Sequence, residues 1–444
     1  MRRPNVLLVV ADDMGYGDLS RFNEGRCRSP HLDRLADDGV CLTQHYSGSP
    51  VCAPARASLL TGLYPHRTGA IDTLQGRGLD RIALSEETIA DCFRAAGYRT
   101  GLVGKWHNGA LDRRYHPNAR GFEEFAGFSG GLSHYYDYWL DLNGTEVPGE
   151  GRYLTDVLTD HAIDFIRRHA REPFFLVVAY NAPHFPMHAP QHLVDAYVER
   201  GETLGASLTY AMIEALDAGV GRIDETLGDV GVREDTIVLF TSDNGPYLGE
   251  VEGVSLDRFN IGLRGAKHNV FEGGRMESAM THFTDWLPTL LAATGAAHHE
   301  TERLDGENVL PLLEGAEMST EPVRFWQNNR YAPRVEGNAA MRDGDWKLVR
   351  PVIPSLMRVT DRDRSIDRAL NYRQPDRITT VDDSPLPDLD DGERHTALLF
   401  ELSTDPFEQH DLAAEQPDRV MRMSAALETW FEEVERERAA IPDS

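Results

Sequence analysis

The amino-acid sequence predicts an α/β protein whose large, doubly wound central sheet carries helices on both faces and is followed by a small α+β unit. Three observations predict this fold. Short, continuously apolar runs alternate with amphipathic stretches of helical length, as they do where parallel strands are joined by helices. Two of the apolar runs end in acidic residues. After about residue 315 a hairpin pattern and one long amphipathic stretch replace the alternation.

Four apolar runs predict buried strands of the central sheet, because each is short and bounded by polar residues. They are residues 5–11, 100–103, 174–179 and 236–241. The stretches between them predict helices at residues 30–38, 57–62, 85–96, 154–169 and 210–229. In such sheets ligands bind beyond the carboxyl ends of the strands. We therefore expect a metal site where Asp12–Asp13 and Asp243–Asn244 follow two of the runs.

Residues 316–444 predict a small α+β domain with a short antiparallel sheet, after a larger domain of residues 1–315. Residues 338–350 predict a hairpin with its turn at Asp343–Gly344. Residues 358–395 are rich in Asp, Arg and Pro and predict a long loop, followed by a strand within residues 396–412. Residues 417–438 predict a terminal helix with one apolar face.

Composition excludes several classes of protein. The net charge of −27 over 444 residues repels nucleic acid and anionic membranes, so neither is an expected partner. No run approaches 18 apolar residues, which argues against a membrane span, and four cysteines are too few for a disulfide scaffold. With no signal-like segment, the expected location is cytoplasmic. Had a signal peptide been trimmed, it would be periplasmic or secreted.

Two motifs stand out for their chemistry. The paired carboxylates Asp12 and Asp13 at a strand end can hold a hard cation, although an acidic turn is an equal alternative. In Cys52-Ala53-Pro54-Ala55-Arg56, the proline suits the first turn of a helix. Cys52 then lies at the helix N-terminus, where the dipole favours anions, and Arg56 adds a cation one turn on. A buried structural cysteine is the alternative.

Four further motifs follow, each of which alone is compatible with an ordinary loop. They are Gly104-Lys105-Trp106-His107, Asn181-Ala182-Pro183-His184, Thr241-Ser242-Asp243-Asn244-Gly245, and Leu263-Arg264-Gly265-Ala266-Lys267 with Glu272-Gly273-Gly274 after it. Only three of the 45 basic residues are lysines, and Lys105 and Lys267 are two of them. Gly127-Phe128-Ser129-Gly130-Gly131 matches a nucleophile elbow, but we expect it to be chance because no strong strand is predicted before it.

In this order the six motifs resemble those of the sulfatase family, in the alkaline phosphatase superfamily. The resemblance covers about residues 4–320, with a weaker match over 338–412, and C-x-P-x-R is its most specific part. It implies a large mixed sheet of the alkaline phosphatase type. It also implies that a formylglycine-generating enzyme oxidises Cys52 to formylglycine. The implied cofactor is calcium, with magnesium as the alternative, bound by Asp12, Asp13, Asp243, Asn244 and the modified Cys52.

The resemblance also implies roles in hydrolysing a sulfate ester. Arg56 would hold the formylglycine hydrate, whose hydroxyl attacks sulfur, while Lys105, His107, His184 and Lys267 surround the sulfate. His184 or Lys267 would protonate the leaving alcohol, and His107 would accept the proton when sulfate is expelled. A sulfated carbohydrate is the favoured substrate, with an aryl sulfate as the other choice. Ser133 resembles a family position that contacts the sulfate. His188, Arg330 and the Arg-rich residues 358–377 are the expected sugar contacts, with solvated surface as an equal alternative for them.

Two features depart from the family pattern. About 15–20 residues are missing after Glu272-Gly273-Gly274, which places one strand of the sheet in doubt, and Asn108 replaces the usual Leu after the Lys-Trp-His motif. Two other functions stay open. One is hydrolysis of a phosphodiester or a phosphonate monoester, which relatives with the same cysteine motif perform. The other is binding of sulfated glycans without catalysis.

Overall fold

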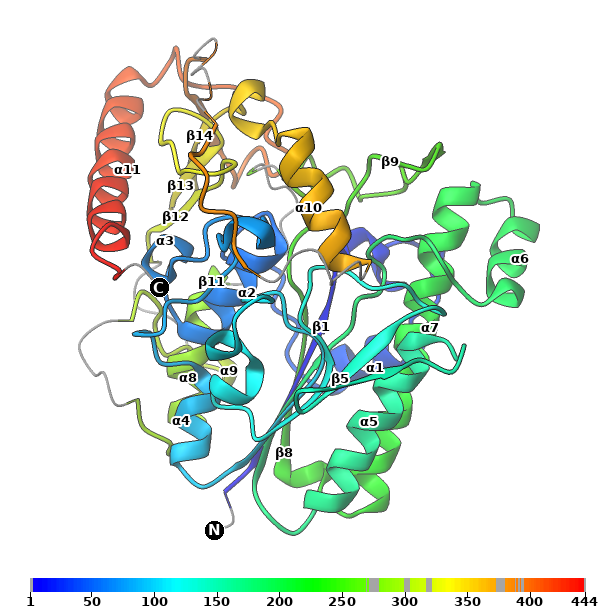
Figure 1. Ribbon diagram of the computed structural model, residues 1–444. Coiled ribbons are helices and arrows are strands. Elements are labelled where there is room, and N and C mark those ends of the chain that lie inside the picture. Colours follow the sequence, from blue (N-terminus) through cyan, green and yellow to red (C-terminus); the bar gives the residue numbers. More distant parts are fainter. Residues whose placement is uncertain are drawn as a thin grey trace.

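The computed structural model describes residues 3–268, 270, 279–298, 304–316, 322–372, 380–387, 389, 392 and 395–442. Its centre is a seven-stranded sheet with the order β6-β5-β4-β3-β7-β1-β8 (Figure 1). Five strands are parallel, and the β5–β6 hairpin adds two antiparallel strands at one edge. The strands are β1 (Asn5–Ala11), β3 (Arg99–Lys105), β4 (Glu124–Phe128), β5 (Trp139–Leu142), β6 (Thr145–Pro148), β7 (Phe174–Ala179) and β8 (Thr236–Ser242).

Helices cover both faces of this sheet, as Figure 1 shows, which confirms the predicted fold class. One face carries α1 (Pro30–Asp38), α5 (Leu154–His169), α6 (Gln191–Glu199) and α7 (Leu204–Asp229). The other carries α2 (Cys52–Thr61), α4 (Ile89–Ala95) and α8 (Trp286–Thr294). Side chains of β1 alternate between the two cores, with Leu7 and Val9 in one and Val6 and Leu8 in the other. This explains why β1 is apolar throughout.

A second, four-stranded antiparallel sheet lies near the C-terminus, with the order β12-β13-β14-β15. Its strands are β12 (Arg324–Gln327), β13 (Ala339–Asp343), β14 (Trp346–Arg350) and β15 (Leu398–Glu401). The predicted hairpin is confirmed as β13–β14, and Gly344 in its turn has a positive φ of 55°. The terminal helix α11 (Pro417–Arg438) packs Leu427 and Trp430 against this sheet. The domain boundary at residue 315 stays a prediction.

The remaining elements are short. They are β2 (His45–Tyr46), β9 (Glu250–Val251), β10 (Val254–Ser255), β11 (Thr281–His282), α3 (Pro65–Thr68) and α9 (Leu310–Leu313). In the described part of the chain, no helix is both long and apolar enough to cross a membrane.

The prediction of one long loop over residues 358–395 is wrong, because α10 (Asp361–Asn371) lies within it. The Thr360 side chain caps its N-terminus by accepting from the Asp363 amide at 3.1 Å. The charged composition of this segment is typical of a loop, but its acidic residues are bonded to other parts of the chain. Arg77 Nε donates to Asp363 Oδ1 at 2.6 Å, and the Gly76 amide donates to Asp367. Part of the Arg-rich stretch, residues 373–379, lies outside the described residues.

The sequence also failed to predict β4, β5, β6, β12 and α6. Strand β4 ends just before Ser129, so the stated reason for rejecting the nucleophile elbow is wrong. An elbow also requires a helix after the nucleophile, and residues 129–138 contain none.

Strand β8 forms one edge of the large sheet. Among the described residues no strand pairs with its outer side, and Val238 and Phe240 border a cavity of about 950 Å³. The shortened stretch after Gly274 placed one strand of the sheet in doubt. Residues 271–278, where that departure falls, lie outside the described residues.

A fully buried ion pair joins β14 to the turn after β15. Lys347 Nζ lies 3.0 Å from Glu408 Oε1, and neither side chain is exposed. We predict that Lys347→Met lowers the free energy of unfolding by about 3–5 kcal/mol, because it leaves the Glu408 carboxylate buried without its ammonium partner. Lys347→Met with Glu408→Leu should regain most of the loss, as measured by urea unfolding.

The matched control is the exposed pair between Arg350 and Glu428, whose carboxylate side chain is 52% exposed. Glu428→Ala should cost less than about 1 kcal/mol. Equal losses for Lys347→Met and Glu428→Ala would contradict the role given to burial.

Candidate active site

Acidic residues meet at the carboxyl ends of β1 and β8. Asp12 and Asp13 follow β1 directly, and Asp243 follows β8. The two strands are parallel neighbours whose last residues are in register. The Asp243 amide donates to the Ala11 carbonyl at 3.0 Å, and the Asp13 amide donates to Asp243 Oδ1 at 3.3 Å. The sheet therefore brings three carboxylates to one edge, as the sequence predicted.

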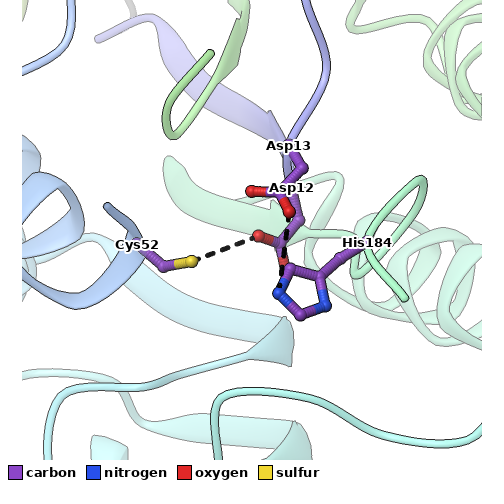
Figure 2. Close-up of side chains that lie close together, drawn as sticks. All are labelled: Asp12, Asp13, Cys52 and His184. Atoms are coloured by element: carbon purple, nitrogen blue, oxygen red, sulfur yellow. Dashed lines mark hydrogen bonds and ion pairs between the residues drawn. The ribbon is translucent and has the colours of Figure 1, made fainter. Parts of the chain in front are cut away.

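Cys52 is the first residue of α2, which packs against α3 and α8. Val51 before it is extended and Pro54 occupies the first turn. No side chain of the described residues caps this end, so its free backbone N–H groups and the positive end of the helix dipole lie beside the thiol. Cys52 is buried, and its Sγ donates to Asp12 Oδ1 at 3.6 Å (Figure 2).

Arg56 and Lys105 contact the carboxylates from two other elements. Arg56, one turn into α2, donates from Nε to Asp243 Oδ2 at 3.0 Å. Lys105, the last residue of β3, lies with Nζ 2.6 Å from Asp12 Oδ2. Gly104 before it has a φ of 107°, and a Cβ there would lie 2.0 Å from the carbonyl oxygen of Ala179. Position 104, directly before Lys105 at the end of β3, therefore requires glycine.

Lys267 and His184 complete the contacts around Asp13. Lys267 Nζ donates to Asp13 Oδ2 at 2.9 Å and to Cys52 Sγ at 3.3 Å. The Nδ1–H of His184 donates to the carbonyl of Phe185 at 2.8 Å, because a carbonyl can only accept. Its Nε2 lies 3.7 Å from Asp13 Oδ2, and Figure 2 shows this ring turned toward the carboxylate.

The close charges change the acidity of the buried groups. Burial raises the pKa of the Cys52 thiol, but Lys105 and Lys267 outweigh that effect and bring it down to about 6. The pKa of Asp243 is raised to about 6 by burial and then by the charge of Asp12. Three carboxylates this close therefore require neighbouring cations to remain ionised together.

The two histidines differ in their electrostatic surroundings. Burial and Lys267 both lower the pKa of His184, but the carboxylates of Asp12 and Asp13 outweigh them, so the pKa is raised overall. The pKa of His107 lies well below its ordinary value because of burial and then the charge of Lys105. His107 Nε2 donates to the Thr73 carbonyl at 3.4 Å. Its Nδ1 is buried and has no hydrogen-bond partner among the described residues.

The oxygen donors fit a hard divalent cation. Carboxylates and amide oxygens are the ligands that calcium and magnesium prefer. Asn244 Nδ2 donates to Asp13 Oδ1 at 2.7 Å, and its own Oδ1 is buried without a hydrogen-bond partner in the part of the chain described. Asp12, Asp13, Cys52 and His184 also place one potential ligand atom each within 4.8 Å of the others. The predicted metal ligands therefore lie together.

The three predicted substrate contacts bond to other side chains and to the backbone. Ser133 Oγ donates to the carbonyl of His134 at 3.3 Å, and the Ser133 carbonyl accepts from Asn181. The His188 ring lies parallel to that of His134, with centroids 5.8 Å apart. Arg330 Nη1 donates to Asp72 Oδ1 at 2.5 Å, which turns its charge toward a protein carboxylate.

Sequence reasoning missed two positioning residues. The hydroxyl of Tyr135 lies 2.7 Å from the Asn181 carbonyl oxygen and 2.8 Å from that of His184, so it holds the loop that carries His184. Nothing in its sequence context marked it. Asn108 was noted only as a departure from the family pattern. Its Nδ2 lies 3.0 Å from the Ala53 carbonyl oxygen and thereby ties the first turn of α2 to the loop after β3.

Comparisons with known proteins agree with this geometry. The family model named Sulfatase matches residues 4–296. N-acetylgalactosamine-6-sulfatase of Homo sapiens is 29% identical, with 96% of this chain and 85% of that protein covered. Arylsulfatase A of Bos taurus is 31% identical, with 92% and 83% covered.

Solved structures agree as well. Ps i-CgsB in complex with k-i-k-neocarrahexaose superposes with a TM-score of 0.79 at 26% identity, covering 97% of this chain and 93% of that one. The phosphonate monoester hydrolase of Agrobacterium radiobacter is similar in fold alone, with a TM-score of 0.56 at 22% identity and coverage of 99% and 96%. From the family model and the curated relatives, we conclude that this chain belongs to the sulfatase family and is a sulfuric ester hydrolase.

Proposed function

We propose that this sulfatase removes sulfate from a sulfated carbohydrate, with an aryl sulfate as the simpler substrate. The observation that carries the proposal is the set of cations around Cys52. Lys267 donates to its sulfur, and Lys105 and Arg56 donate to the neighbouring carboxylates of Asp12 and Asp243. The N-terminus of α2 adds the positive end of a helix dipole. Such a site favours a tetrahedral oxyanion. Relatives with names that specify sulfated sugars support the carbohydrate.

We further propose that Cys52 acts as formylglycine and that Asp12, Asp13, Asp243 and Asn244 hold calcium, with magnesium as the alternative. When present, the aldehyde hydrate supplies an oxygen nucleophile and the cation supplies positive charge beside it. A formylglycine-generating enzyme would be the partner during maturation. The burial of Cys52 at a helix start, with the Asp12 carboxylate 3.6 Å from its sulfur, supports this assignment.

In the proposed mechanism, the basic residues bind the sulfate group and the two histidines transfer protons. Lys105, Lys267 and Arg56 stabilise the charge that builds on the sulfuryl oxygens. His184 carries its Nδ1 proton toward Phe185, so its Nε2 is the atom that faces the site and donates to the departing alcohol. His107 carries its proton on Nε2, which donates to the Thr73 carbonyl, so the lone pair on Nδ1 is free to accept a proton. It accepts the proton of the second hydrate hydroxyl when sulfate is expelled.

We propose that the sugar binds over Ser133 and His188 and reaches Arg330. The ring of His134 lies between those of His188 and Tyr372, with the Tyr372 centroid 4.5 Å away. Tyr372 directly follows α10, which lies within the predicted loop of residues 358–395. This segment therefore adds an aromatic ring beside the two histidines. Aromatic faces and imidazoles suit the apolar faces and hydroxyls of a sugar ring.

The test compares sulfate and phosphate esters. We expect the wild type to hydrolyse p-nitrophenyl sulfate well above a p-nitrophenyl phosphodiester, and to release sulfate from at least one member of a panel of sulfated saccharides. The readouts are nitrophenolate absorbance and sulfate detection. A strong preference for the phosphodiester would instead support the phosphodiester or phosphonate hydrolase alternative, to which the shared fold alone points.

The lysines provide a sharper test of the site. Lys105→Arg and Lys267→Arg keep the charge but replace a compact ammonium with a wide planar fork in a buried space. We expect each to lower kcat/KM for p-nitrophenyl sulfate by about 100-fold or more. Arg350→Lys, in the second sheet, is the control and should stay near wild type. Near-normal turnover in both lysine variants would refute their assignment.

A further inference from the structure

A second cluster of metal-ligating side chains lies outside the proposed active site. Glu87 precedes α4, Cys92 lies within that helix, and His298 follows α8. One ligand atom from each lies within 4.8 Å of the others. None of the three residues contributes to the sulfate or calcium chemistry proposed above.

Burial leaves these groups with little compensation from water. Cys92 is fully buried, and the side chains of Glu87 and His298 are only 14% and 12% exposed. His298 Nδ1 is buried and has no hydrogen-bond partner within the described residues. Burying a carboxylate costs free energy, which a cation bound beside Glu87 would offset.

The spacing agrees with a tetrahedral metal better than with a hydrogen bond. His298 Nε2 lies 3.5 Å from Glu87 Oε2, which is long for a hydrogen bond. Two nitrogen or oxygen ligands about 2.1 Å from a tetrahedral zinc lie roughly 3.4 Å apart. A thiolate, an imidazole and a carboxylate are also the donor types that zinc takes, whereas calcium and magnesium prefer oxygen alone.

We propose that Glu87, Cys92 and His298 form a zinc site that ties α4 to the segment after α8, with water as the fourth ligand. Binding converts the Cys92 thiol to a zinc thiolate and releases its proton to solvent. Both helices contribute to the core on the α2 face of the sheet, through residues such as Cys92 and Leu291. Because zinc binds the folded chain, it should raise the unfolding temperature.

The experiment uses the full chain with Cys52→Ser, which removes the other thiol that lies among carboxylates. Titration with Co²⁺ should give a sulfur-to-cobalt charge-transfer band, and Zn²⁺ should displace it. A further Cys92→Ser should abolish the band, whereas a further Cys41→Ser, which changes a cysteine outside the cluster, should leave it.

His298→Ala and Glu87→Gln provide variants that keep the thiol. Each should weaken Zn²⁺ binding about tenfold or more and remove the rise in unfolding temperature. The proposal is wrong if Co²⁺ gives no thiolate band in the Cys52→Ser protein, or if the band survives Cys92→Ser. It is also wrong if both His298→Ala and Glu87→Gln bind Zn²⁺ as tightly as their parent.

Discussion

Charge balance at the carboxyl edge of the sheet is the constraint on which the rest of this structure depends. Parallel pairing of β1 with β8 brings Asp12, Asp13 and Asp243 together, and three buried carboxylates repel one another strongly. Arg56 and two lysines offset that repulsion, each delivered by a different element. Helix α2, strand β3 and the loop that carries Lys267 must therefore all meet at this edge. In the proposed function, these cations together with a bound metal ion would favour an anionic ester beside Cys52.

The positions of the three lysines gain a physical explanation from this arrangement. Two of the three lysines contact carboxylates of the proposed active site, and the third, Lys347, lies in a fully buried pair with Glu408. An ammonium occupies less space than a guanidinium and hydrogen-bonds in any direction, which suits these enclosed positions. The net charge of −27 does not prevent anion binding, because screening over about 8–10 Å separates the pocket from the outer surface.

The sequence predicts best those elements whose residue pattern reflects burial, on both sides for a central strand or along one face for a helix. Strand β1, helix α5 and helix α11 appear at the expected residues. The edge hairpin β5–β6 escaped prediction because it is half exposed and lacks a continuous apolar run, and α10 escaped because tertiary salt bridges stabilise its charged residues. In the site, motif residues converge as expected. Asn108 and Tyr135 were missed because they act on backbone carbonyls, a role that no local pattern reveals.

The central claim is that residue 52 works as formylglycine within this cluster of charges. It is tested most directly by mass spectrometry of the peptide that contains residue 52, from active protein made in a host with the maturation enzyme. The account predicts an aldehyde in place of the thiol, in a fraction of molecules that rises and falls with sulfatase activity. Full activity in protein whose Cys52 is entirely unmodified would contradict it, and an unmodified thiol with glycan binding but no sulfate release would indicate a binding protein.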